Sequence, residues 1–404
     1  MNEVSGSNTR TAAATQARSG QLWPLWLGFI LVSLNMRLIF TTVGPLLAEF
    51  HLSFSSTLMV TTLPLVLLSV FSITGVKLRQ RFGEERALFL ALALLCLGCA
   101  VRGMGEMMLL VGTAIGSIGI AIMNVIMPAL ARKRFQPRQM GSVMGIYALM
   151  LGVGAVIGAS GAFPLYLALG ANEPAAYQSL ALWALPALLA MLIWLPQLRY
   201  AAAAGLAPGA QAGERVNLYR QPVAWSVTLF FGLQVLNLYV FLAWMPTIFI
   251  SRGSTPEAAA LLFSASQFSL MIGGFLVPFF AARAADQRGF MVLTILLCLF
   301  GTLGILYAPA NTALVWVLLL GFGQGAGPGL GTYLFVVRSA SGESAARLSA
   351  MAQSAGYLIA GLGPLLVGYL WTFSGSWDLP LLLVAGLLVV ELLVCLPAGK
   401  NQRI

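Results

Sequence analysis

Long apolar segments separated by short polar ones make up nearly the whole chain. A helix that crosses a bilayer needs about 20 mostly apolar residues. Stretches of this kind predict twelve membrane-spanning helices, near residues 22–48, 57–76, 87–102, 107–131, 140–169, 176–197, 223–250, 257–281, 290–307, 313–337, 347–371 and 377–397. We therefore expect an all-α, polytopic membrane protein, and the even number of spans places both termini on one side.

The spans fall into two sets of six around a central polar connection. Residues 198–222 combine an alanine run with glycine, proline and arginine, a composition typical of a flexible linker. Offsets of 201 to 207 residues align similar positions, among them Pro45 with Pro246, Arg132 with Arg338 and Met144 with Met351.

The alignment predicts two pseudo-symmetric six-helix bundles, an arrangement that recurs in secondary transporters. We expect a disordered cytoplasmic N-terminus at 1–21, bundles at 22–197 and 223–397, a cytoplasmic linker at 198–222 and a cytoplasmic tail at 398–404. The glycine-rich spans 140–169 and 347–371 are expected at the contact between the bundles, where small residues let helices approach closely.

The composition narrows the function classes. Of 404 residues, 59% are hydrophobic and only 8% are charged, whereas soluble domains carry roughly 25% charged residues. This excludes a cytosolic enzyme, a disordered protein and a nucleic-acid binder. One His and four Cys within apolar runs predict neither a metal centre nor a disulfide framework. We expect no cofactor and no enzymatic activity.

The net charge of +10 is explained by topology. If the N-terminal side is the inner one, 19 of the 22 basic residues lie in inner segments, and only Arg102 and Arg252 lie in outer loops. Such a bias is the positive-inside signal. It predicts a multi-pass protein of the bacterial inner membrane with both termini in the cytoplasm.

The remaining basic residue, Arg37, lies about 15 residues into the first span. An arginine at this depth costs roughly 2.5–3.5 kcal/mol on insertion scales. One interpretation is that Arg37 faces an aqueous central cavity and binds an anionic or strongly polar substrate, with Thr41 one turn further on the same face. The other is a structural contact with helix-end carbonyls or a polar side chain.

Neutral polar residues within the other spans could line the same cavity with amide and phenol groups. Interhelical hydrogen bonds are the alternative role for each of them. The candidates are Asn124, Tyr147, Gln234, Asn237, Gln267, Gln324, Gln353 and Tyr357.

The source of energy is expected to be a gradient, because the chain has no Walker sequence for nucleotide binding. Glu391 is the one carboxylate well inside a span, and its place near the inner end predicts that it reaches the inner interface. Carriage of a coupling proton by Glu391, or by Glu49 and His51 at the outer mouth, is the alternative. Uniport also stays open.

The layout resembles the major facilitator superfamily, whose loop between spans 2 and 3 carries a G-x-x-x-D-R-x-G-[RK] pattern. The corresponding segment here begins at Gly75 and ends at Arg86. Arg81, Gly83 and Arg86 fit the pattern, and the resemblance implies a gating role for them. Gln80 occupies the position of the usual acidic residue.

Within that superfamily the chain is similar to the bacterial cyanate and nitroimidazole transporter (CynX/NimT) family. The similarity is carried by Asn35-Met36-Arg37 with Thr41 and Val43-Gly44-Pro45-Leu46-Leu47, by Trp225 with Thr228-Leu229-Phe230, by Trp244 with Pro246, and by Met351-Ala352-Gln353-Ser354 with Gly356-Tyr357. It implies alternating-access transport of a small anion such as cyanate, or of a nitro-heterocycle, by a monomer in the lipid bilayer. Polyspecific efflux of neutral or cationic drugs is the alternative.

Overall fold

The computed structural model describes residues 19–43, 46, 49–50, 54–199 and 217–402, and these are helical with no strand among them. The terminal segment 1–18, most of the predicted linker and His51 lie outside this part of the chain. The helices are α2 (Ser19–Thr41), α3 (Phe54–Val101), α4 (Glu106–Arg134), α5 (Met140–Ala168), α6 (Glu173–Leu182), α7 (Ala184–Trp194), α9 (Pro222–Ser251), α10 (Pro256–Ala281), α11 (Arg288–Tyr307), α12 (Ala313–Val337), α13 (Gly342–Ser374) and α14 (Asp378–Val394).

These helices supply the twelve predicted crossings. Within the described ranges, nine helical segments have the length and apolar composition to cross a membrane. The 48-residue α3 is long enough to hold both the second and the third span. Helices α6 and α7 follow one another and together form a single span. The shorter apolar helices α2 and α14 complete the set. The prediction of an all-α, twelve-helix fold is confirmed.

The second and third spans meet at Gly83. Its backbone, with φ of 79° and ψ of 167°, breaks the helix inside α3. This conformation is essentially restricted to glycine, because a Cβ atom would clash with the backbone. The sequence predicts a longer non-helical loop here, but both spans continue as helix up to the break.

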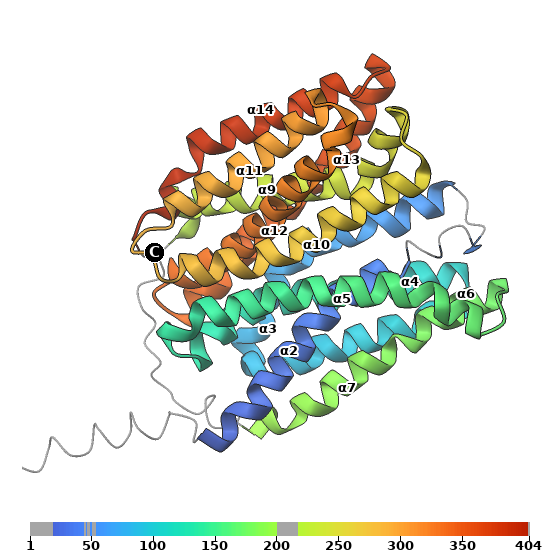
Figure 1. The fold of residues 1–404 in the computed structure, drawn as a ribbon. Helices are drawn as coiled ribbons and strands as arrows, with labels where there is room; N and C mark the ends of the chain where they lie inside the picture. The colour runs from blue at the N-terminus through green and yellow to red at the C-terminus, as the bar shows by residue number, and fades with distance from the viewer. Residues whose placement is uncertain (1–18, 44–45, 47–48, 51–53, 200–216, 403–404) are drawn as a thin grey trace, which may run out of the picture.

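The two sets of six helices meet at two main contacts. Helix α5 packs against α10, and α13 packs against α3 and α4. Figure 1 shows α5 and α10 side by side at the boundary between the halves, and it places the first residues of α2 and the C-terminal end at the same end of the bundle. The glycine-rich spans therefore lie at the contact between the halves, each against helices of the other half.

Replacing Gly83 by alanine should lower the stability of the protein by about 1–3 kcal/mol, because alanine is strained in this backbone conformation. Thermal unfolding of the purified protein in detergent would measure the loss. Gly386→Ala is the matched control, since Gly386 is exposed on α14 with no neighbour within 4 Å of an added Cβ. The control should keep or raise the unfolding temperature. Equal behaviour of the two variants would contradict the prediction.

Candidate substrate cavity

A cavity of about 840 Å³ lies between the two halves. Helices α2, α4 and α5 of the first half and α9, α10, α12 and α13 of the second half supply most of its wall. The polar side chains on that wall are Arg37, Thr41, Asn124, Tyr147, Ser160, Tyr239, Ser264, Gln267, Gln324, Thr332, Gln353 and Tyr357. Among the described lining residues, Arg37 is the one with a charged side chain, so the electrostatic field of the wall is positive.

The guanidinium group of Arg37 shares its cavity wall with phenols rather than with acids. The phenols belong to Tyr147, Tyr239 and Tyr357, which come from α5, α9 and α13. No carboxylate of the described residues lies within 4 Å of it. The hydroxyl of Thr41 is on the same wall and donates to the backbone oxygen of Leu38 at 3.0 Å. The guanidinium donors are thus available to a molecule in the cavity.

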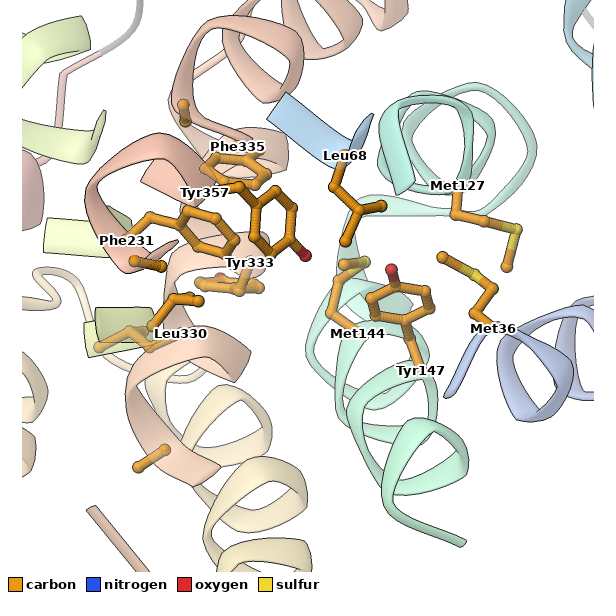
Figure 2. Packing of buried hydrophobic residues seen from close by; sticks show 14 of the residues in the cluster. Met36, Leu68, Met127, Met144, Tyr147, Phe231, Leu330, Tyr333, Phe335 and Tyr357 are labelled. Carbon is orange, nitrogen blue, oxygen red and sulfur yellow. The ribbon is translucent and has the colours of Figure 1, made fainter. Parts of the chain in front are cut away.

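Asn124 of α4 joins two of these phenols across the boundary between the halves. The hydroxyl of Tyr147 donates to Asn124 Oδ1 at 3.2 Å, and Asn124 Nδ2 donates to the hydroxyl of Tyr357 at 3.4 Å. Figure 2 shows the hydroxyl groups of Tyr147 and Tyr357 directed into the space between the halves. The asparagine amide therefore fixes the position of a phenol from each half.

The backbone of Asn124 makes a second contact with the other half. Pro128, four residues further along α4, has no N–H group, so the carbonyl oxygen of Asn124 lacks its usual helical donor. Two side chains of α13 replace that donor: Gln353 Nε2 at 3.0 Å and the hydroxyl of Ser349 at 3.4 Å. Gln353 also donates to Ser349 at 2.7 Å. A proline in one half thus creates an acceptor for the other half.

Further contacts close the cavity on the side of the Gly83 break. We call this the basic side, because Arg79 lies there beside the break in α3 and Lys133 and Arg134 lie there at the C-terminal end of α4. The hydroxyl of Ser69 donates to the backbone oxygen of Ser354 at 2.7 Å, and Gln80 donates to Glu343 at 3.4 Å. The apolar side chains of Val125, Ala129, Ala346 and Ala350 pack together beside them.

The cavity extends away from the basic side. Its lining residues run along α5 from Tyr147 to Ser160, and α5 begins on the basic side at Met140. They run along α10 from Phe263 to Gly274, and α10 ends on the basic side. The cavity is therefore closed on the basic side and extends toward the opposite face of the protein.

Eight of the ten residues predicted to bind substrate line this cavity: Arg37, Thr41, Asn124, Tyr147, Gln267, Gln324, Gln353 and Tyr357. Gln234 and Asn237 do not, because this face of α9 turns toward α12 and α14. Asn237 Oδ1 accepts from Gln324 Nε2 at 2.8 Å, and Gln234 donates to Glu391. These two amides make interhelical hydrogen bonds, the alternative role considered for them.

The buried charges on the basic side form a cluster that the sequence motif does not identify. Glu84 and Glu85, with side chains 7% and 1% exposed, follow directly after Gly83. Glu84 pairs with Arg79 and Lys133, both at 2.8 Å, and Glu85 pairs with Arg134 at 3.0 Å. The adjacent pair Glu84 and Glu85, in a segment that is otherwise basic, is the feature of the sequence that could have indicated this cluster.

The three residues for which a gating role is implied differ in their surroundings. Gly83 provides the break in α3, whereas Arg81 and Arg86 are exposed and make no ion pair with the described residues. Arg81 lies over the ring of Phe82, 5.2 Å from its centroid. The contact with the opposite half comes from the neighbouring Gln80, the residue at the usual acidic position.

The predicted position of Glu391 is wrong. The side chain is 0% exposed and does not reach the inner interface, because Gln234 holds it inside the second half. Glu49, the alternative at the outer mouth, accepts a hydrogen bond from the hydroxyl of Tyr166 at 2.8 Å.

Comparison with known proteins places this architecture among transporters. The sequence profile of the Major Facilitator Superfamily matches residues 25–364. The chain is 37% identical over 382 residues to the 2-nitroimidazole transporter of Escherichia coli, covering 93% of this chain and 95% of the relative. It is 30% identical over 373 residues to the cyanate transport protein CynX of Escherichia coli, covering 90% and 95% of the two chains.

Solved structures show the same fold at much lower sequence identity. The fucose:proton symporter FucP of Escherichia coli superposes with a TM-score of 0.72 at 14% identity, covering 92% of this chain and 97% of that one. The proton:xylose symporter XylE gives a TM-score of 0.71 at 16% identity, covering 92% and 93%. From the profile match, the relatives and the twelve-helix architecture it follows that this chain is a membrane transporter belonging to the Major Facilitator Superfamily.

Proposed function

We propose that this protein is a secondary active transporter for a small planar solute that is anionic or carries a nitro group. Arg37 is the observation that supports the proposal most strongly, because it offers a cation to the cavity and has no carboxylate partner among the described residues. An arginine fork matches the two oxygens of a carboxylate or nitro group. The similarity to a 2-nitroimidazole transporter and to a cyanate transport protein supports the same solute class.

The size and lining of the cavity favour a ring over a three-atom anion. A volume of about 840 Å³ is far larger than cyanate, which is comparable to one or two waters at about 30 Å³ each. The aromatic rings of Tyr147, Tyr239 and Tyr357 line the same cavity as the cation. A planar heterocycle or aromatic acid would contact both groups, so we place the nitro-heterocycles ahead of cyanate.

Transport follows from alternating access between two states of the halves. In the present state the basic side is closed by the contacts of α13 with α3 and α4, and the cavity extends toward the opposite face. The distribution of basic residues puts the basic side in the cytoplasm, so this state faces outward from the inner membrane. We take 22–197 and 223–397 as the units that rock around the cavity.

Competition binding to the purified protein tests the substrate class. Radiolabelled 2-nitroimidazole is bound first, and benzoate, nitrate, cyanate and the lipophilic cation tetraphenylphosphonium are then added one at a time as competitors. We expect planar nitro compounds and aromatic acids to compete best and the cation not to compete. Binding of tetraphenylphosphonium with no binding of the anions would instead support polyspecific drug efflux.

Replacing Arg37 by alanine should weaken substrate binding roughly 10- to 100-fold, because hydrogen bonds to a charged group contribute about 1.5–3 kcal/mol. Arg37→Lys should give an intermediate loss, since lysine keeps the charge but not the planar fork. Equilibrium binding and proteoliposome counterflow measure both effects. The control is Arg220→Ala, at an exposed position ahead of α9. Unchanged binding by a folded Arg37→Ala protein would contradict the role of Arg37.

Replacing Gln353 by leucine should favour the state that opens to the basic side. The change removes one hydrogen bond between the halves, which contributes about 0.5–1.5 kcal/mol, so the population should shift roughly 2- to 10-fold. The readout is the rate at which maleimide labels a cysteine introduced at Ala346, which is buried in the closed contact.

The background for this labelling lacks the four native cysteines, and the matched control is Gln267→Leu. Gln267 also lines the cavity, but it donates to Ser266 on its own helix rather than across the halves. Labelling should accelerate in the Gln353 variant alone. Equal rates in both variants would show that the contact with Asn124 does not hold the basic side closed.

A further inference from the structure

Glu391 occupies a sealed position inside the second half, apart from the central cavity. The side chain is 0% exposed, and both of its oxygens accept from the same donor, Gln234 Nε2, at 2.9 and 3.0 Å. The other end of that amide, Gln234 Oε1, lies 3.7 Å from the thiol sulfur of Cys298 on α11. The carboxyl group is thus joined to α9 directly and to α11 through one amide.

Among the described residues, none provides a positive charge that pairs with this carboxyl group. Within the described part of the chain, no Lys, Arg or His lies within 4 Å of its oxygens. The titratable groups that interact with it are the thiols of Cys298 on α11 and Cys395 just after α14. Desolvation penalises a buried, unpaired anion far more than a neutral acid. The protonated form of the Glu391 carboxyl group therefore has a lower free energy in this site than the ionised form.

The same site touches helices that form the wall of the central cavity. Gln234 passes close to α12 at Gly327, where an added Cβ would overlap Gln234 Oε1. Three residues along α9, Asn237 accepts from Gln324, which lines the cavity. Asn237 Nδ2 is buried with no hydrogen-bond partner in the described residues. Amides of α9 and α12 therefore lie between Glu391 and the wall of the cavity.

We propose that Glu391 is the proton-binding group that couples transport to a proton gradient, and that α9 and α12 transmit its protonation to the central cavity. One proton binds the carboxyl oxygen in one state of the cycle and leaves it in the other. The inference rests on the proposed transport function, and it locates the coupling site away from the substrate cation Arg37. The glutamine next to it orients the carboxyl group in both forms.

Proteoliposomes that contain the full-length protein separate the two proposals. Counterflow of 2-nitroimidazole or benzoate at equal pH tests transport itself, and accumulation driven by an imposed pH gradient tests coupling. A pH-sensitive dye inside the vesicles records proton movement. In Glu391→Gln, which keeps the shape of the side chain and one oxygen that can accept from Gln234, we expect counterflow within about twofold of wild type and at least a tenfold loss of gradient-driven accumulation.

The matched control is Glu173→Gln, at an exposed acid at the start of α6, which should keep both activities. Wild-type accumulation by Glu391→Gln would overturn the proposal and leave Glu391 a structural hydrogen-bond acceptor. Substrate movement by the wild type without proton movement would overturn it too. Absence of counterflow in the wild type would instead count against the proposed transport function and, with it, the coupling role.

A second measurement uses the wild-type chain and does not depend on how well the variant folds. Dicyclohexylcarbodiimide reacts with protonated carboxyl groups in apolar surroundings, and mass spectrometry identifies the modified peptide. We expect modification of Glu391, a substrate-dependent change in its extent, and loss of gradient-driven accumulation in proportion to it. Modification that leaves accumulation intact, or no modification of Glu391 with or without substrate, would contradict the proposal.

Discussion

Within a bilayer, every backbone polar group needs a partner from the protein itself, because lipid offers none. Continuous helices satisfy this requirement along most of the chain. Where a helix lacks one of its own hydrogen bonds, a neighbouring helix can supply the partner. At Pro128 the helical ladder loses a donor, and Gln353 and Ser349 of the opposite half replace it. The contact between the halves therefore satisfies a need that α4 cannot meet internally.

Arg37 and Glu391 lie in different halves and in different surroundings. Arg37 faces a cavity, where water or a solute can solvate its charge. Glu391 is enclosed by the second half, with one amide as its hydrogen-bond donor. They do not pair with each other, unlike the buried acids Glu84 and Glu85, which have cations beside them. A guanidinium group and a carboxyl group held apart can each respond to a different ligand.

Hydropathy and the distribution of basic residues were sufficient to predict twelve helices and the position of the glycine-rich spans. They also singled out Arg37, because a cation at that depth is conspicuous in any apolar sequence. They could not predict that Gln234 and Asn237 turn away from the cavity, since every face of α9 is apolar enough to be buried and packing decides its rotation. The enclosure of Glu391 likewise depends on a neighbour 157 positions away in the sequence.

The acceptor that Gln353 uses on α4 belongs to the backbone, whereas the side chain of the same residue, Asn124, faces the cavity. A substitution at position 124 changes the chemical surface offered to a solute but leaves the carbonyl in place, provided that Pro128 is kept. Such a substitution removes the side-chain bond to Tyr357, but the bond of the carbonyl to Gln353 can persist while recognition varies during evolution. A lineage can acquire a new substrate range at this position without having to rebuild the contact that seals its membrane against leakage.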